Sequence, residues 1–306
     1  MAVRPQSSTS VSDKHVDSRL EELEIDLLLE SVLRYYGYDF RDYEASAVRR
    51  RIRECMLAGR ISTISRFQEK VLHQPAVLER FLRAFSTTGL SMFSDPRFYL
   101  AFRSKVVPQL KTYPFTRIWH AGCSTGEEVY SLAILLHEEN IYHRTRIYAT
   151  DLSQESVRQA RIGSFSVAAA DEFENNYIQA GGKRSLSDYF RKRGNRLLFE
   201  RSLTKNIVFS EHNLATDGSF NEFQVIVFRG VLVNFNHKLR ERVGRLIYDS
   251  LSRFGVLALG ATEVLEDLPF EDHYSLLDSE AHLYQKHGPG VVSAFPGIEK
   301  KELQQG

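Results

Sequence analysis

The sequence has little of what marks several specialised protein classes. Its 306 residues include two cysteines, Cys55 and Cys123, too few for a disulfide-rich secreted scaffold and consistent with a reducing compartment. No apolar run approaches the roughly 18–20 residues of a membrane-spanning helix, and the polar N-terminus has no apolar signal core. We therefore expect a cytoplasmic protein that does not insert directly into a membrane.

The sequence also lacks an excess of charge of either sign. Forty Lys and Arg residues stand against 39 Asp and Glu residues, which gives a formal net charge of +1. A basic excess is the usual mark of nucleic-acid-binding chains, so no nucleic-acid partner is expected. No His or Cys pair has the spacing of metal ligands, so no metal site is expected either. The length suggests two domains.

Residue patterns divide the chain into successive parts. Residues 1–20 are polar and are predicted to form a disordered leader. Residues 21–90 contain four segments with apolar residues at helical spacing and are predicted to form a small all-α domain. Residues 91–114 are expected to be a linker, residues 115–286 an α/β domain, and residues 287–306 a polar tail.

After Pro114, short runs rich in Ile, Val and Phe alternate with amphipathic segments. The predicted strands cover residues 117–121, 146–150, 207–210, 225–228 and 256–260, and the predicted helices residues 127–138, 154–161 and 237–252. This alternation predicts a mostly parallel sheet with right-handed crossovers. Residues 189–210 show short strands without a helix, so we predict a small β-subdomain inserted there.

A loop of small residues follows the first predicted strand. Its members are Ala121, Gly122, Cys123, Ser124, Thr125 and Gly126. Glycines remove Cβ atoms where a ligand must touch the backbone. Glu127 and Glu128 open the next helix, where a pyrophosphate would otherwise bind. Two carboxylates at this position disfavour phosphate and favour a cationic group on the ligand.

An acidic residue ends the next predicted strand. Asp151 stands where nucleotide-binding folds hold ribose hydroxyls. A glycine loop and a ribose-binding acid without a phosphate site favour S-adenosylmethionine (SAM), which joins adenosine to an ammonium and a sulfonium. A dinucleotide and a purely structural joint between strand and helix remain alternatives at this point.

Several segments resemble, in the same order, the motifs of the chemotaxis-receptor methyltransferases, the CheR family. The similar segments are residues 121–131, 149–152, 208–214 and 220–229. The first resembles the SAM loop of that family, and the third, with Asn213 and Leu214, its adenine-side motif. The fourth resembles the strand whose end carries Arg229. The resemblance extends over about residues 24–286.

The resemblance implies a Rossmann-like SAM methyltransferase domain with a small β-subdomain, preceded by the all-α domain. SAM is then the cofactor, S-adenosylhomocysteine the product, and glutamate side chains of chemoreceptors the methyl acceptors. The implied cofactor-binding residues are Ala121, Gly122, Ser124, Thr125, Gly126, Glu127, Asp151, Asn213 and Leu214. Arg229 is the remaining candidate for a catalytic role.

The sequence departs from the resembled family where the substrate carboxylate is arranged. Ser94 stands where the family has an arginine, and Asn234 where it has a tyrosine. A serine hydroxyl cannot replace the charge of an arginine, so we expect weakened methyl transfer. Whether the chain is an enzyme is therefore open. The alternatives are a degenerate CheR-like module that senses SAM or S-adenosylhomocysteine in a signalling complex, and a methyltransferase with another acceptor.

Two surfaces are candidates for protein partners. A basic cluster on the second predicted helix, ordinarily a solvated face, consists of Arg49, Arg50, Arg51, Arg53 and Arg60. The resemblance implies instead that acidic receptor helices dock there. In some members of the resembled family the β-subdomain binds a receptor tail by strand addition, and the basic residues 191–193 would suit an acidic peptide tail.

Overall fold

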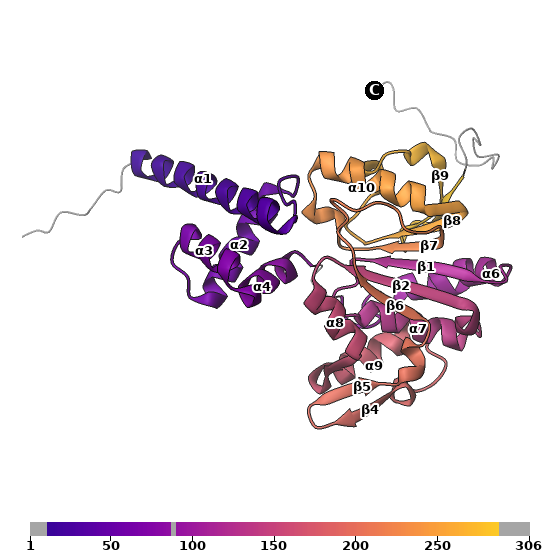
Figure 1. Cartoon of the computed structure of the whole chain (residues 1–306). Coiled ribbons are helices and arrows are strands. Elements are labelled where there is room, and N and C mark those ends of the chain that lie inside the picture. Colours follow the sequence, from indigo (N-terminus) through magenta and orange to yellow (C-terminus); the bar gives the residue numbers. More distant parts are fainter. Residues whose placement is uncertain (1–10, 87–89, 288–306) are drawn as a thin grey trace, which may run out of the picture.

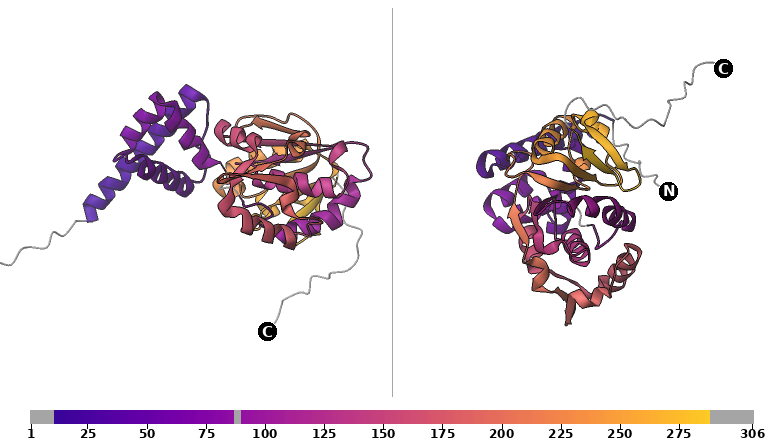
Figure 2. Two further views of the ribbon diagram at one scale, coloured as in Figure 1. Left: turned by 90° about the horizontal axis from the view of Figure 1, so that it is seen from below. Right: turned by 90° about the vertical axis from the view of Figure 1, so that its right-hand side faces the viewer.

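The computed structural model describes residues 11–86 and 90–287, and Figure 1 shows a helical module beside an α/β domain. The helices of the module are α1 (Val11–Tyr36), α2 (Ala45–Gly59), α3 (Ile64–His73) and α4 (Pro75–Phe85). The left view of Figure 2 shows the module at one side of the domain, as a body of its own. The predicted order, an all-α domain followed by an α/β domain, is confirmed.

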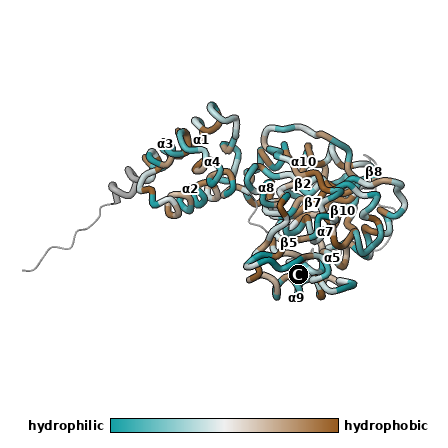
Figure 3. The backbone as a smooth tube through the Cα atoms, turned by 60° about the horizontal axis from the view of Figure 1, so that its bottom comes forward, coloured by the Kyte–Doolittle hydropathy of each residue, from teal (hydrophilic) through white to brown (hydrophobic). Residues whose placement is uncertain are grey.

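Packing of apolar faces explains the helical module. On α1, Ile25, Leu28 and Val32 recur at three- and four-residue spacing and are buried, on the helix that packs against α3. Thr63 begins α3 by accepting a hydrogen bond from the N–H of Arg66 at 3.3 Å. Brown and teal stretches alternate along these helices in Figure 3, as expected for helices with one buried face.

The start of α1 differs from the prediction. The helix begins at Val11, so a disordered leader is wrong for residues 11–20, while residues 1–10 lie outside the described part of the chain. The polar composition suggested disorder because it offers little apolar surface to bury. A helix that already exists, however, gains one hydrogen bond per added residue without a new nucleation cost. The packed half of α1 can therefore carry a polar extension.

The segment expected to be a linker, residues 91–114, is helical and belongs to the α/β domain. It contains α5 (Pro96–Ala101), a π-helical turn (Phe102–Val106) and α6 (Val107–Leu110). Phe98, Phe102 and Val106 are buried in the same core as the strands. Because these side chains recur every four residues, they form one buried helix face, and the α/β domain begins before Pro96.

A seven-stranded, mostly parallel sheet forms the centre of the domain, in the order β6-β2-β1-β7-β8-β10-β9. The parallel strands are β6 (Ile207–Glu211), β2 (Thr145–Asp151), β1 (Thr116–Ala121), β7 (Phe223–Phe228) and β8 (Leu251–Leu259). The antiparallel strands are β10 (Leu283–Lys286) and β9 (Tyr274–Asp278). The chain passes outward from β1 through β2 to β6 and returns at β7. In such sheets, ligands bind where the strand order reverses, here between β1 and β7.

Side chains of the sheet alternate between two cores, one on each face. Ile118 and Val225 lie in the core shared with α7 (Glu127–Glu138) and α8 (Gln154–Ile162). Trp119 and Ile226 lie in the other core, with α10 (His237–Ser250). This second core continues into the helical module and includes Phe85 of α4. The module therefore packs against the α/β domain.

The β-subdomain begins earlier and ends earlier than predicted. Its strands are β3 (Ser164–Ser166), β5 (Arg196–Phe199) and β4 (Phe190–Arg193), in that order across the small sheet. The prediction of residues 189–210 is wrong for residues 207–210, which form β6 beside β2 in the main sheet. An unpredicted helix, α9 (Ala170–Gln179), separates β3 from β4. A three-residue strand such as β3 has no periodic pattern that sequence analysis could detect.

Two further expectations concern the C-terminus and membranes. The predicted tail, residues 287–306, lies outside the described part of the chain apart from His287. Within residues 11–86 and 90–287, no helix is both long and apolar enough to cross a membrane. Even α1, which has 26 residues, carries acidic and basic residues along its length.

Candidate active site

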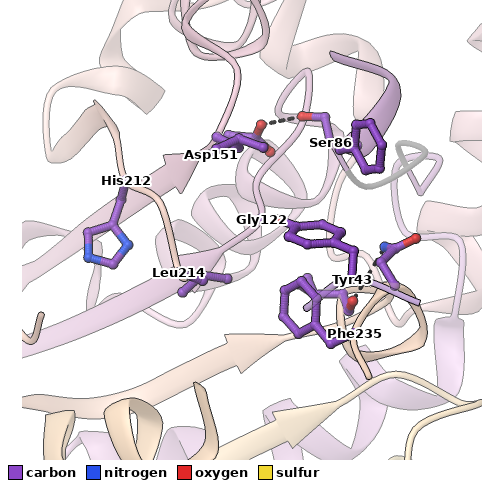
Figure 4. Close-up of a pocket in the computed structure, with 11 residues that line it drawn as sticks. Tyr43, Ser86, Gly122, Asp151, His212, Leu214 and Phe235 are labelled. Carbon is purple, nitrogen blue, oxygen red and sulfur yellow. Dashed lines mark hydrogen bonds between the residues drawn. The ribbon is translucent and has the colours of Figure 1, made fainter. Parts of the chain in front are cut away.

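The carboxyl ends of β1, β2, β6 and β7 meet at one edge of the sheet, and a pocket lies there. It is small, with a cavity volume of about 30 Å³. Gly122, Asp151 and Leu214 line it from the α/β domain, and Tyr43 and Phe85 from the helical module. Figure 4 shows Tyr43 of the helical module on the same pocket as Asp151 and Leu214 of the α/β domain. Both parts therefore build one site.

The loop after β1 is a tight turn that depends on small residues. The N–H groups of Gly122 and Cys123 both donate to the carbonyl of Thr150, at 2.8 and 2.9 Å, and so tie the loop to the end of β2. Gly126 has a φ of +99°, and a Cβ at this residue would lie 2.9 Å from the Cβ of Ala160. Because Gly122 also has a positive φ and no side chain, its backbone is open to a ligand in the pocket.

Asp151 is the buried acid of the pocket. The N–H groups of Ser124 and Ser153 donate to its carboxylate at 2.8 and 3.0 Å, and the hydroxyl of Ser86 donates a third hydrogen bond. Burial raises the pKa of Asp151, and these hydrogen bonds offset part of that rise. Figure 4 shows Ser86 and Asp151 pointing toward each other. Asp151 is 2% exposed, and both of its carboxylate oxygens already accept hydrogen bonds within the chain, one of them from a hydroxyl.

The contribution of the helical module to this pocket was not predicted. Tyr43 forms an isolated antiparallel bridge with Phe235, and their ring centroids lie 5.1 Å apart. The N–H of Glu44 donates to the carbonyl of Asn234 at 2.8 Å. Tyr43 and Phe85 are buried like ordinary core aromatics. In the sequence they look like any other residue of a helical core, so no local signal distinguishes them.

Arg229 lies in a buried ion-pair network and does not line the pocket. Its guanidinium donates to Glu128 and to Asp95, each at 2.6 Å, and lies 4.3 Å from the ring centroid of Phe98. Burial by itself would lower the pKa of Arg229, but Glu128 and the other nearby acids raise it. Burial would also raise the pKa of Glu128, but Arg229 and His120 hold that pKa below its usual value. Two carboxylates already occupy the guanidinium, so it is poorly placed to bind a third.

The second buried arginine is Arg51 on α2, which is 6% exposed, so its predicted place in the exposed basic cluster is wrong. Its Nη2 donates to the Oδ1 of Asn234 at 3.0 Å, and its guanidinium lies 5.9 Å from the ring centroid of Phe85. Within the described part of the chain, no carboxylate forms an ion pair with Arg51, and its Nε has no hydrogen-bond partner. Burial lowers the pKa of Arg51. Arg51 is thus a cation without a counter-ion behind two residues of the pocket wall.

The spacing of apolar residues on α2 could have revealed Arg51. The buried residues of the helix are Ala47, Val48, Arg51, Ile52 and Cys55. They form one face at three- and four-residue spacing, and Arg51 is its single charged member. Sequence analysis grouped the arginines of this segment as one basic cluster, because a run of adjacent arginines hides which of them points inward.

The two positions that depart from the resembled motifs lie in different surroundings. Asn234 lines the pocket and accepts the hydrogen bond from Arg51. Ser94 precedes Asp95, and its buried hydroxyl has no hydrogen-bond partner among the described residues. Neither side chain carries charge, so neither supplies what an arginine would bring to a substrate carboxylate.

The other predicted cofactor residues surround the pocket without lining it. They are Ala121, Ser124, Thr125, Gly126, Glu127 and Asn213. The hydroxyl of Thr125 donates to Glu127 at 2.7 Å, and burial raises the pKa of Glu127. The side-chain oxygen of Asn213 accepts a hydrogen bond from the N–H of Ala215 at 3.0 Å. This bond shapes the turn that contains the lining residue Leu214. Their arrangement supports the pocket wall, and their contacts with the cofactor stay predictions.

Comparison with known protein families accounts for both parts of this site. The model described as "CheR methyltransferase, SAM binding domain" matches residues 86–281, and "CheR methyltransferase, all-alpha domain" matches residues 23–86. The chain belongs to the CheR methyltransferase family. Its α/β domain is the SAM-binding domain of that family, and its helical module is the all-α domain.

Relatives of known name agree with this family. A Pseudomonas putida protein named "Putative methyltransferase Cher3" is 39% identical over 268 residues, which cover 88% of this chain and 98% of the relative. A chemotaxis protein methyltransferase of Listeria monocytogenes is 27% identical and covers 76% of this chain and 86% of the relative. Chemotaxis protein methyltransferase 1 of Pseudomonas aeruginosa is 26% identical, with coverages of 79% and 86%.

The residues of the pocket fit SAM, the cofactor of the CheR family. With SAM in this pocket, Asp151 would face the ribose hydroxyls, and Leu214 and Phe85 would offer apolar surface to the adenine. The carboxylate of Glu127, at the start of α7, suits the ammonium of the methionine part. The exposed backbone of Gly122 allows a close approach.

Proposed function

We propose that this chain transfers the methyl group of SAM to glutamate side-chain carboxylates of a chemoreceptor, with an activity attenuated at Ser94 and Asn234. The observation that carries the proposal is the buried guanidinium of Arg51, which has no counter-ion in the described chain and an unpartnered Nε. A buried cation without a partner is costly to the fold. An anionic substrate group entering between Phe85 and Asn234 would remove that cost.

The proposed reaction needs no general acid or base from the chain. SAM supplies an electrophilic methyl group on a sulfonium, and a carboxylate attacks it directly. The residues of the chain have to hold the carboxylate in line and exclude water. In this proposal Arg51 holds the carboxylate by charge, while Tyr43 and Phe235 close the pocket above it. Arg229 acts as a positioning residue that fixes Glu128 and the end of β7.

The proposed receptor-docking surface is the outer face of α2. Arg50 and Arg53 are 62% and 61% exposed on their side chains, and Arg49 is 38% exposed. Arg53 already pairs with Glu21 of α1 at 2.7 Å, and Arg50 pairs weakly with Glu54 at 3.8 Å. Surface pairs of this kind are worth little, so an acidic receptor helix can replace them. Arg51 lies on the same helix, which connects docking to the pocket.

The β-subdomain is a second proposed contact for a receptor. Its edge strand β4 presents residues 191–193, which are exposed. Arg191 pairs with Glu200 at 2.8 Å, while Lys192 and Arg193 form no ion pair with any carboxylate of the described chain. An extended acidic peptide could add a strand there by main-chain hydrogen bonds. Deleting the receptor tail would then weaken binding without changing the affinity for SAM.

The test is methylation of purified receptor cytoplasmic fragments with tritiated SAM, measured as base-labile methyl ester. Arg51→Met should lower turnover by about 10²–10³-fold, the usual cost of a lost charged clamp. Its affinity for S-adenosylhomocysteine, measured by calorimetry, should stay unchanged. Arg66→Met, on the exposed surface of α3, is the matched control and should keep full turnover. Full turnover in Arg51→Met would refute the role of Arg51.

The second candidate function is a module that senses SAM or S-adenosylhomocysteine without transferring methyl groups. It is favoured by the uncharged side chains at residues 94 and 234. Under this alternative the parent chain yields no methyl ester with any receptor fragment, yet binds S-adenosylhomocysteine. The double variant Ser94→Arg with Asn234→Tyr distinguishes the two candidates. An attenuated enzyme should gain methyl-ester formation, whereas a module that lacks a substrate site should not.

A further inference from the structure

Helix α1 carries an apolar stripe that nothing in the described chain covers. Leu20, Leu23 and Leu27 are 54%, 55% and 52% exposed. Single exposed leucines are common on protein surfaces, but three on one face of one helix form a contiguous patch. The spacing of three and four residues is the a-to-d, d-to-a spacing of a coiled-coil seam.

The stripe is separate from the face of α1 that packs on the module. At 100° per residue, the stripe lies about 160° around the helix from the centre of the buried face. The buried face comprises Ile25, Leu28, Leu29 and Val32. One helix therefore has two apolar faces on opposite sides. The buried face explains the fold of the module, and the exposed one has no role in that fold.

The helix is also free to accept a partner along this face. At 1.5 Å per residue, the 26 residues of α1 span about 39 Å, whereas the neighbouring α3 has only 10 residues. In Figure 1 the first part of α1 extends beyond α2, α3 and α4. At the stripe itself, Leu20 borders a hollow that Met56 and Ile64 also line, so a partner helix approaches α2 and α3 at that end.

The order of residues makes the stripe complementary to itself in an antiparallel pair. In an antiparallel pair, the residue numbers of two facing positions always add to the same total. If Leu20 of one copy faces Leu23 of the other, Leu23 of the first copy therefore faces Leu20 of the second. Both of these central layers are then apolar. A pattern that reads the same from both ends is what a two-fold symmetric interface requires.

Charges beside the stripe match the same arrangement. Arg19 and Asp26 are exposed and lie on one flank of the stripe, at the g positions of the heptad. In the antiparallel pair, g positions face g positions, so Arg19 of each copy meets Asp26 of the other. Neither residue has an ion pair within residues 11–86 and 90–287. At the end of the stripe, Glu30 and Arg34 pair with each other at 2.6 Å and close the seam.

We infer that two copies of this chain associate through antiparallel α1 helices, with Leu20, Leu23 and Leu27 in the seam and Arg19–Asp26 pairs at its edge. A pair of single helices buries less than a standard interface of about 1,600 Å². The association is therefore weak, with a dissociation constant in the micromolar range. It brings two chains together by the face of α1 opposite its buried apolar face.

Sedimentation equilibrium of the full chain, over roughly 2–200 µM, tests the association. The parent chain should show a monomer–dimer equilibrium, and Leu23→Glu should raise the dissociation constant at least tenfold. Leu57→Glu is the matched control, because Leu57 is 79% exposed on α2, outside the stripe, and its change should have no effect. A parent chain that stays monomeric would refute the inference and leave the stripe to a helix of another protein. A dimer that survives Leu23→Glu would place the interface elsewhere.

A charge exchange tests the antiparallel geometry. Arg19→Asp alone and Asp26→Arg alone each place like charges opposite one another, and each should weaken association several-fold. The double variant restores two opposite-charge pairs and should recover the parent dissociation constant. In a parallel pair, position 19 would face Glu24 instead, and the double variant would not recover. Unfolding midpoints of all variants should equal that of the parent, because these side chains are exposed.

Discussion

Arg229 and Arg51 are the two arginines buried in the described chain, and they differ in what surrounds them. Arg229 has Glu128 and Asp95 within 2.6 Å and an aromatic ring beside it. Arg51 has a single amide oxygen as its hydrogen-bond partner, that of Asn234. The first cation is compensated within the chain and stabilises the junction of β7, α7 and the segment before α5. The second cation, Arg51, has no carboxylate partner in the described chain.

This difference separates a structural role from a binding role more clearly than family motifs do. A buried charge without a carboxylate partner is costly to the fold, so such a residue is a candidate for binding an anion from outside the chain. Arg229 matches its family motif, but two of its guanidinium nitrogens already donate to carboxylates. Arg51 lies outside the motifs that sequence analysis used, and no carboxylate of the described chain pairs with it, although the Nε of both arginines lacks a hydrogen-bond partner there. The predictions below test this division of roles.

The largest expected effect is on stability. Arg229→Met removes the cation and leaves Glu128 buried without compensation, which should lower the free energy of unfolding by about 3–5 kcal/mol. Arg51→Met removes a buried cation that has no carboxylate partner in the described chain, so it should change that free energy by less than about 1 kcal/mol. Urea denaturation of both variants gives the comparison. Equal losses would mean that the two arginines play the same structural role.

The fold was predictable wherever a pattern repeats. Helices such as α7 and α10 and the parallel strands have regular apolar spacing, and their predicted ranges agree with the structure within a few residues. The segment of residues 96–110 shows the limit of this approach. Its buried face is periodic, but a composition similar to that of a connecting segment led to its assignment as a linker. Short β3 and the polar start of α1 carry no periodic signal at all.

The site was predictable only on its α/β side. The loop after β1 and Asp151 follow from local chemistry, since glycine, small residues and an acid at a strand end together suit a nucleoside ligand. The other wall depends on contacts between distant parts of the chain. Arg51 and Asn234, for example, are 183 residues apart in the sequence. Ser86 reaches Asp151 in the same way, and no local pattern shows that either pair will meet.

The next prediction concerns a variant in which Arg51 gains a carboxylate partner, as Arg229 already has. Asn234→Asp places a carboxylate at the atom that accepts the bond from Arg51. A hydrogen bond between charged groups is worth about 1.5–3 kcal/mol, part of which is offset by burying the new carboxylate. We expect a net rise in stability of about 1 kcal/mol and a fall in methyl-ester formation of at least about tenfold. Thermal unfolding and the tritium assay measure the two effects.

A matched variant tests whether the loss of turnover in Asn234→Asp comes from the new charge beside Arg51. Asn234→Ser removes the amide without adding charge, so it should leave Arg51 uncompensated and reduce turnover much less than Asn234→Asp. If both variants lose turnover equally, the amide of Asn234 itself matters to the reaction and competition for Arg51 is not the cause. If neither loses turnover, Arg51 does not hold the substrate.

The smallest expected effect is the pH dependence that the Arg229–Glu128 pair gives to the free energy of unfolding. Arg229 and His120 hold the pKa of Glu128 below its usual value in the fold, against the opposing effect of burial. A carboxyl group with a lowered pKa contributes stability that is present above its unfolded pKa, about 4.3, and is lost as the pH falls through the folded value. The free energy of unfolding, measured by urea denaturation from pH 7 to pH 3, should therefore decline at the acid end. Glu128→Gln should remove that part of the decline, whereas Arg51→Met should keep it, because no carboxylate of the described chain pairs with Arg51. An identical acid decline in parent and Glu128→Gln would show that the Arg229–Glu128 pair does not stabilise the fold in the way its geometry indicates.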